Sequence, residues 1–193
     1  MSLQTITSNE TELVLTVLKN PRVQYSATNL AEKVGISPMG ALKIVKNLEK
    51  EGLLTSKTVG KSIIYNIDMF PEYNKQYLKF LLQREAQQAK PYTKVWINEL
   101  KKVTAAEIII LFGSILKKDS VQDIDVLFVT KELSKLKKEI QGIEVLSTTK
   151  IHPVFQSQED FRKNIRKEDK ALLSAIRGIV VKGEDVYMEL MKT

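Results

Sequence analysis

Two short groups of residues in the second half of the chain have the types and spacing to bind phosphate and a metal ion. Asp123 and Asp125 are two residues apart at the start of an apolar run, so on a strand both carboxylates point to one face. Mg²⁺ prefers such hard oxygen ligands, together with the phosphates of a substrate. Gly113 and Ser114 follow Glu107–Phe112, which the run of β-branched residues predicts to be a buried strand. A glycine at this point lets the backbone approach a phosphate, which neighbouring N–H groups and the serine hydroxyl can bind.

The order of these residues resembles the nucleotidyltransferase superfamily that includes DNA polymerase beta, in particular the minimal nucleotidyltransferases of archaea and bacteria. The chain has Leu111–Ser114, then eight residues, then Asp123–Val129 as a second buried strand. The resemblance implies transfer of a nucleotidyl group from a nucleoside triphosphate (NTP) with Mg²⁺ to an acceptor hydroxyl, with release of pyrophosphate. It implies these roles: Asp123 and Asp125 as catalytic residues and metal ligands, and Gly113, Ser114, Lys117 and Lys118 as nucleotide-binding residues.

The sequence departs from this family in two places. Residues 115–118 are Ile-Leu-Lys-Lys, where family members often have small and basic residues. Active members also carry a third carboxylate on a later strand, which corresponds here to Ile151–Phe155. The alignment places Val154 at that position, with His152 as its neighbour on the same face. Two alternatives to an active transferase therefore stay open. One is an inactive domain that acts as a nucleotide sensor or protein-docking module, and the other is an antitoxin-like partner of another protein.

Turn residues and apolar spacing divide the first half of the chain into three helices and a hairpin. Asn9 and Glu12 form an N-x-x-E pattern that predicts the start of the first helix. Ser37 and Pro38 predict the third helix, as its N-cap and first residue. After this helix the sequence pattern changes from one typical of helices to one typical of strands. The two predicted strands, at 54–58 and 62–67, flank a glycine-containing turn. This order resembles the winged helix-turn-helix regulators of bacteria and archaea, whose third helix lies in the major groove and whose wing contacts the DNA backbone.

We expect the third helix to present to double-stranded DNA the face opposite its apolar positions Ala41, Val45 and Leu48. The residues expected to bind DNA are Met39, Lys43, Lys46 and Asn47 on this helix and Lys61 in the wing. The helix contains no arginine, and arginine or lysine to guanine is the commonest specific base contact, so the bases that it reads are not predicted. The predicted function is transcriptional regulation. Two alternatives are that the lysines only form a solvated face, or that the domain mediates protein contacts.

A polar segment with apolar residues at helical spacing joins the two halves, and Pro91 divides it into two helices. We predict a winged helix domain at 1–68, a helical connector at 69–103 and a nucleotidyltransferase-like domain at 104–193. The fold class is α+β, with three helices and a hairpin wing followed by a mixed sheet packed with helices. Trp96 is expected to anchor the start of the second domain. The alternative is that a helix beyond the wing forms a homodimer.

Composition narrows the classes of partner and compartment. The 193 residues include 30 Lys+Arg and 23 Asp+Glu, which gives a net charge of +7 and favours a polyanionic partner. The absence of cysteine excludes thiolate metal sites, and the single histidine excludes a multi-histidine metal cage. No apolar run approaches the roughly 18 residues of a membrane-spanning helix. The N-terminus shows no secretory signal. We therefore expect a cytoplasmic protein with no membrane partner.

Overall fold

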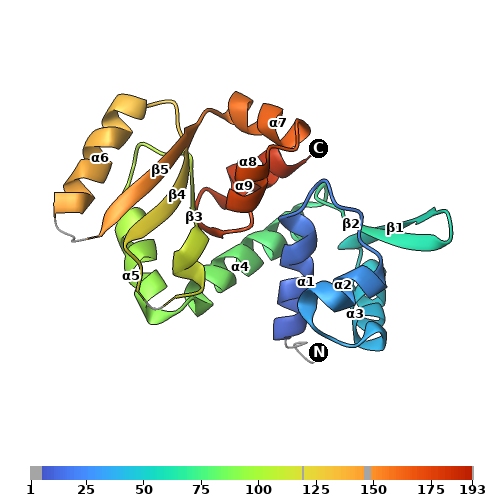
Figure 1. The fold of residues 1–193 in the computed structure, drawn as a ribbon. Helices are drawn as coiled ribbons and strands as arrows, with labels where there is room; N and C mark the ends of the chain where they lie inside the picture. The colour runs from blue at the N-terminus through green and yellow to red at the C-terminus, as the bar shows by residue number, and fades with distance from the viewer. Residues whose placement is uncertain (1–5, 119, 146–148, 193) are drawn as a thin grey trace. The chain divides into compact units, whose positions relative to one another are not determined.

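The computed structural model describes residues 6–118, 120–145 and 149–192, and the chain divides into two compact units at Leu81–Leu82 (Figure 1). The first unit has three helices followed by an antiparallel hairpin, which confirms the predicted order of elements. A long helix then continues into the second unit. These elements are α1 (Ser8–Leu18), α2 (Ala27–Val34), α3 (Pro38–Lys50), β1 (Leu54–Val59), β2 (Ser62–Ile67) and α4 (Glu72–Gln88).

Capping side chains set the helix starts of the first unit. Ser37 caps α3 as predicted, and its hydroxyl accepts a hydrogen bond from the N–H of Gly40 at 3.1 Å. The predicted start of α1 at Asn9 is wrong, because Thr7 is the N-cap and accepts a bond from the N–H of Glu10. Thr7 and Glu10 have the same spacing as Asn9 and Glu12, so two capping patterns overlap here and the earlier one forms.

The hairpin is short and closely tied to the helices. Its turn is Gly60-Lys61, since Val59 already pairs with Ser62, and Gly60 has a φ of +59°. The backbone N–H of Tyr65 donates to the carbonyl of Tyr25 at 2.9 Å, which adds a bridge from the segment before α2 to β2. These bonds fix the hairpin to the helical part of the first unit.

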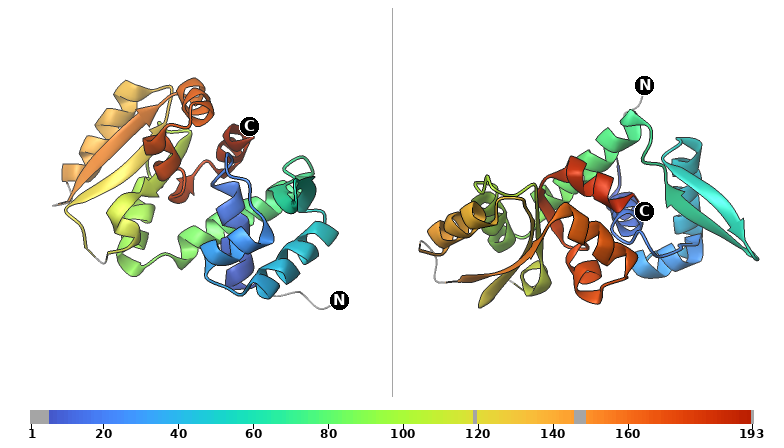
Figure 2. Two further views of the ribbon diagram at one scale, coloured as in Figure 1. Left: turned by 45° about the vertical axis from the view of Figure 1, so that its right-hand side comes forward. Right: turned by 90° about the horizontal axis from the view of Figure 1, so that it is seen from above.

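The second unit is a four-stranded mixed sheet with helices on both faces. The strand order is β5-β4-β3-β6, in which β4 and β5 are parallel and the other pairs are antiparallel. Helix α6 lies on one side of the sheet and α7, α8 and α9 lie on the other (Figures 1 and 2). The elements are α5 (Pro91–Leu100), β3 (Ile108–Phe112), the 3₁₀ helix η1 (Gly113–Leu116), β4 (Asp123–Val129), α6 (Leu133–Val145), β5 (Lys150–Gln156), α7 (Gln158–Arg166), α8 (Lys170–Ala175), β6 (Ile179–Lys182) and α9 (Glu184–Met191).

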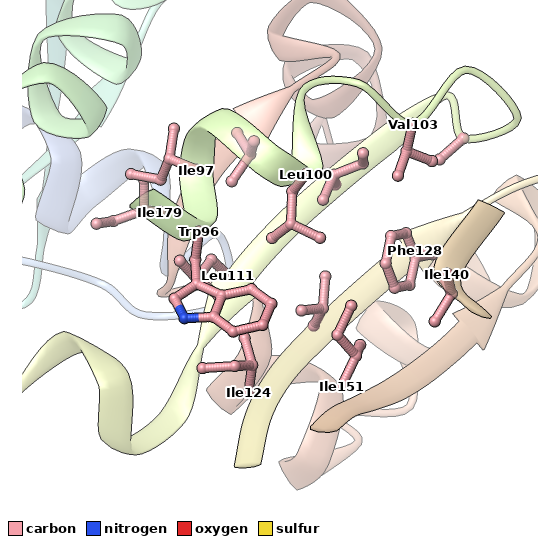
Figure 3. Close-up of a cluster of buried hydrophobic side chains, with 14 of the residues drawn as sticks. Trp96, Ile97, Leu100, Val103, Leu111, Ile124, Phe128, Ile140, Ile151 and Ile179 are labelled. Atoms are coloured by element: carbon pink, nitrogen blue, oxygen red, sulfur yellow. The ribbon is translucent and has the colours of Figure 1, made fainter. Parts of the chain in front are cut away.

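One hydrophobic core lies between the sheet and the helices α5 and α6 (Figure 3). Trp96 of α5 is 5% exposed in this cluster, which confirms its predicted role as a packing anchor. Ile124 and Phe128 of β4 point into the same cluster. Because side chains alternate along a strand, Asp123 and Asp125 lie on the opposite face of β4. The core therefore fixes the face on which both carboxylates stand.

The first half of α4 is bonded to the first unit. The buried Asn74 side chain donates from Nδ2 to the carbonyls of Gly52 and Asp68, both at 2.8 Å. The hydroxyl of Tyr77 donates to Glu10 Oε1 at 2.6 Å, and burial followed by the Glu10 carboxylate raises the pKa of Tyr77. The three-part division with boundaries at 68 and 103 stays a prediction, and these contacts suggest how to test it.

A fragment of residues 1–90 is expected to be considerably more stable than a fragment of residues 1–68. The shorter fragment loses the bonds of Asn74 and Tyr77, each of about 1 kcal/mol, and the burial of Leu78, about 2 kcal/mol. Thermal unfolding followed by circular dichroism measures the difference. Asn74→Ala in the longer fragment should reproduce part of the loss. Equal melting temperatures for the two fragments would show that α4 contributes nothing to the first unit.

Candidate functional site

The predicted DNA-binding residues of α3 share one exposed face of the helix. Met39, Lys43, Lys46 and Asn47 are all exposed, whereas the opposite positions Ala41, Val45 and Leu48 are at most 1% exposed. Lys61 is exposed in the turn of the hairpin, between β1 and β2. The structure therefore presents three lysines to solvent from the two elements of the first unit that a winged helix directs toward DNA.

Glu49 joins α3 to the hairpin, and the sequence analysis missed it. Its Oε2 lies 2.9 Å from Lys46 Nζ, and its Oε1 accepts a hydrogen bond from the Ser56 hydroxyl of β1. The bond from Ser56, followed by that from Lys46, lowers the pKa of Glu49, so the carboxylate is charged and holds both partners. The i, i+3 spacing of Lys46 and Glu49 could have indicated their pairing. The contact with Ser56 depends on how α3 packs against the hairpin.

Gly113 occupies a position that only glycine fits. It lies directly after β3 with a φ of +79°, in the left-handed region that side chains disfavour. A Cβ at this position would lie 2.9 Å from Cγ of Asp125 and nearer still to its Oδ2. The glycine predicted to approach a phosphate therefore lies against one of the two predicted metal-binding carboxylates.

The strand register determines which side chain accompanies Asp125. Asp125 is opposite Phe112 on the β3 side and opposite His152 on the β5 side. His152 Nδ1 lies 3.6 Å from Asp125 Oδ1, whereas Val154 pairs with Leu127. The observed register therefore makes the imidazole of His152, and not the side chain of Val154, the neighbour of Asp125 on β5.

A pocket of about 640 Å³ opens beside these residues. Four of the predicted site residues line it together with four further residues. The lining residues are Ser114, Lys118, Ser120, Val121, Gln122, Asp123, Asp125 and His152. Of the other two predicted residues, Gly113 lies against Asp125, and Lys117 is an exposed residue whose carbonyl accepts a bond from Lys90 Nζ at 2.9 Å. The pocket thus has an ammonium group, hydroxyls and two carboxylates on its walls.

The donor set of this pocket fits one Mg²⁺ ion that is shared with phosphates. Two carboxylates supply hard oxygen ligands, whereas the imidazole nitrogen of His152 beside Asp125 is a ligand that Mg²⁺ does not favour. Within 6–118, 120–145 and 149–192, no three His, Asp or Glu side chains are grouped so that they could hold a metal ion by themselves. None of the helices in these ranges has the length and apolar character needed to cross a membrane.

Comparison with known proteins identifies the first unit. Residues 11–55 match the family model for winged helix-turn-helix DNA-binding domains. No curated protein matches the chain. The similar solved structures include the zinc-responsive MarR family member ZitR of Lactococcus lactis, which is 16% identical and aligns over 52% of this chain and 76% of its own, with a TM-score of 0.31. A ZitR variant in complex with DNA is 14% identical over 52% and 74% of the two chains, with a TM-score of 0.31.

BpsR of Bordetella bronchiseptica is another similar structure, at 15% identity over 50% of this chain and 73% of its own, with a TM-score of 0.34. These TM-scores are low, so the conclusion depends on the family match and on the observed fold of α1, α2, α3 and the hairpin. Residues 11–55 therefore form the main part of a winged helix-turn-helix DNA-binding domain.

Proposed function

We propose that the protein is a transcription regulator that binds double-stranded DNA through α3 and the hairpin, and that its second unit binds a nucleoside triphosphate with Mg²⁺. The observation that carries the proposal is the match of residues 11–55 to a DNA-binding family. The exposed faces of α3 and the hairpin, with Lys43, Lys46 and Lys61, are those that this fold uses to contact DNA.

The charge distribution of the first unit supports binding to phosphates. Lys43 and Lys46 lie on the face of α3 opposite its buried residues. Lys57 lies in strand β1, and Lys61 lies in the turn of the hairpin. Lysines that replace counterions along the DNA backbone supply sequence-independent affinity and position the protein. Selection of duplexes from a random pool by the full chain tests this function. Enrichment of a common sequence is expected, and failure to retain any duplex at low salt would refute it.

The walls of the pocket in the second unit support nucleotide binding. Lys118 and the hydroxyl of Ser114 provide a cation and a hydrogen-bond donor for phosphate oxygens. Asp123 and Asp125 would hold Mg²⁺, which when bound neutralises charge on the phosphates. In this proposal nucleotide occupancy regulates the protein, because the position that the family resemblance aligns with the third carboxylate holds Val154, and the neighbour of Asp125 on β5 is the imidazole of His152.

Nucleotidyl transfer is a second candidate, favoured by the two carboxylates that face one pocket. In that reaction the oxygen of an acceptor hydroxyl would bond to the α-phosphorus, pyrophosphate would leave and the hydroxyl proton would pass to solvent. Detection of radiolabelled nucleotide on DNA, RNA or protein after incubation with a labelled NTP would distinguish transfer from binding alone. A variant with Asp123→Asn must then lose the label.

Binding of Mg²⁺ and nucleotide is expected to be cooperative. Asp123 and Asp125 repel each other on one strand face, and a cation shared with a triphosphate relieves the repulsion. Titration calorimetry with the four α,β-methylene nucleoside triphosphates should show tighter binding of one or more in Mg²⁺, by about 5- to 150-fold. Asp125→Asn should remove this difference, whereas Glu159→Gln, an equal change in charge on α7, should keep it. Absence of binding in Mg²⁺ would exclude the nucleotide function and leave the DNA-binding function intact.

A further inference from the structure

The DNA-facing surface of α3 carries apolar side chains at its start. Met39 is 74% exposed and Leu42 is 38% exposed, although both lie on a helix whose buried stripe is complete without them. Gly40, between them, has no side chain. The start of α3 therefore presents a small apolar surface to the solvent.

The position of this apolar surface matters because of how a recognition helix enters the major groove. Residues near the N-terminus of such a helix contact base edges, and residues further along contact the backbone or more distant bases. Met39 is the second residue of α3 and Leu42 is the fifth, so both lie in the part that reaches the bases. Lys43 follows at once, and Lys46 is already bonded to Glu49.

The chemistry of the major groove limits what these side chains can recognise. The C5-methyl group of thymine is the apolar feature that base pairs present there, and apolar side chains bind it. Asparagine is the side chain that pairs with the N6 and N7 atoms of adenine, and Asn47 is exposed one helical turn after Lys43. Guanine is read most often by arginine or lysine; α3 contains no arginine, and its exposed lysines Lys43 and Lys46 are assigned below to the phosphate backbone.

We propose that Met39 and Leu42 read thymine methyl groups and that Asn47, further along the helix, binds a more distant adenine, so that the bases read by α3 belong to A·T pairs. This inference depends on the DNA-binding half of the proposed function and adds the sequence preference. It assigns specificity to Met39, Leu42 and Asn47 and backbone affinity to Lys43, Lys46 and Lys61.

Substitution of deoxyuridine for thymidine tests the proposal, because it removes only the C5-methyl group. A duplex selected by the full chain is compared with the same duplex carrying deoxyuridine at one thymidine at a time. We expect affinity to fall about fourfold for each contacted methyl group, the factor for one buried methyl-sized group. Deoxyuridine outside the protected region should have no effect.

Variants then assign the methyl contacts to side chains. Met39→Ala and Leu42→Ala should bind the thymidine duplex more weakly and should each lose the difference between thymidine and deoxyuridine at one position. Val95→Ala, which removes an exposed apolar side chain from α5 in the second unit, should keep the difference. Circular dichroism checks that each variant is folded, which is expected because both side chains are exposed.

The outcomes separate this inference from the proposed function. A selected site rich in G·C pairs, or equal binding of thymidine and deoxyuridine duplexes, would overturn the assignment and leave DNA binding standing. Retention of the methyl effect in both alanine variants would also overturn it. Failure to select any duplex would refute the DNA-binding function itself.

Discussion

The triple substitution of Lys43, Lys46 and Lys61 by alanine is expected to weaken binding of the full chain to every duplex, whatever its sequence. These lysines lie on the exposed face of α3 and in the turn of the hairpin. Each lysine that contacts a phosphate releases condensed counterions, so the logarithm of the binding constant falls with the logarithm of salt concentration by about 0.9 per contact. Loss of all three contacts would reduce the slope by roughly 2.7.

Fluorescence anisotropy with a labelled duplex at several salt concentrations measures both affinity and slope. The matched control replaces Lys138, Lys163 and Lys167 by alanine, which changes the net charge equally on exposed positions of the second unit. The control should keep the slope, because its lysines are outside the DNA-binding domain. An unchanged slope in the α3 and hairpin variant, or an equal loss in the control, would contradict the assignment of these three lysines to DNA.

Lys46 is expected to contribute less than Lys43 and Lys61 in single substitutions. In the free protein its ammonium group is bonded to Glu49, and that bond raises the pKa of Lys46. A phosphate must therefore compete with a carboxylate for this group. The exposed ion pair is weak, so competition reduces the contribution of Lys46 without abolishing it.

Gly113→Ala is expected to destabilise the second unit by roughly 2–5 kcal/mol and to disrupt its pocket. The left-handed backbone costs about 1–2 kcal/mol for a residue with a Cβ. Displacement of the Asp125 carboxylate from the space that the new Cβ needs adds about 1–3 kcal/mol. Urea unfolding of the full chain, followed by Trp96 fluorescence, reports on the second unit, because the single tryptophan lies in its core.

Two variants separate the backbone cost from the collision with Asp125. Gly35 has nearly the same φ, +73°, but a Cβ there would have no heavy atom within 4 Å, so Gly35→Ala, followed by circular dichroism, measures the backbone cost in the first unit. Asp125→Ala combined with Gly113→Ala removes the colliding carboxylate, and the double variant should be more stable than Gly113→Ala alone. If the effects of the two substitutions on the free energy of unfolding simply add, the collision with Asp125 does not limit stability.

The sequence by itself determined the features that depend on residues three or four positions apart. Ser37 and Pro38 start α3, and Ala41, Val45 and Leu48 form its buried stripe, as predicted. Capping bonds and helical periodicity are local, so the residue types specify them directly. The one helix start that was wrong involved a local ambiguity, because Thr7 and Asn9 each have a glutamate three residues later.

The tertiary structure alone decided which distant residues meet. A shift of two residues between β4 and β5 leaves every side chain on the same face, so the alternation of apolar residues cannot distinguish His152 from Val154 as the neighbour of Asp125. The contact of Gly113 with Asp125 likewise depends on the pairing of β3 with β4. Hydrophobic alternation specifies the face of each residue, and only the packing of the whole sheet specifies its partner.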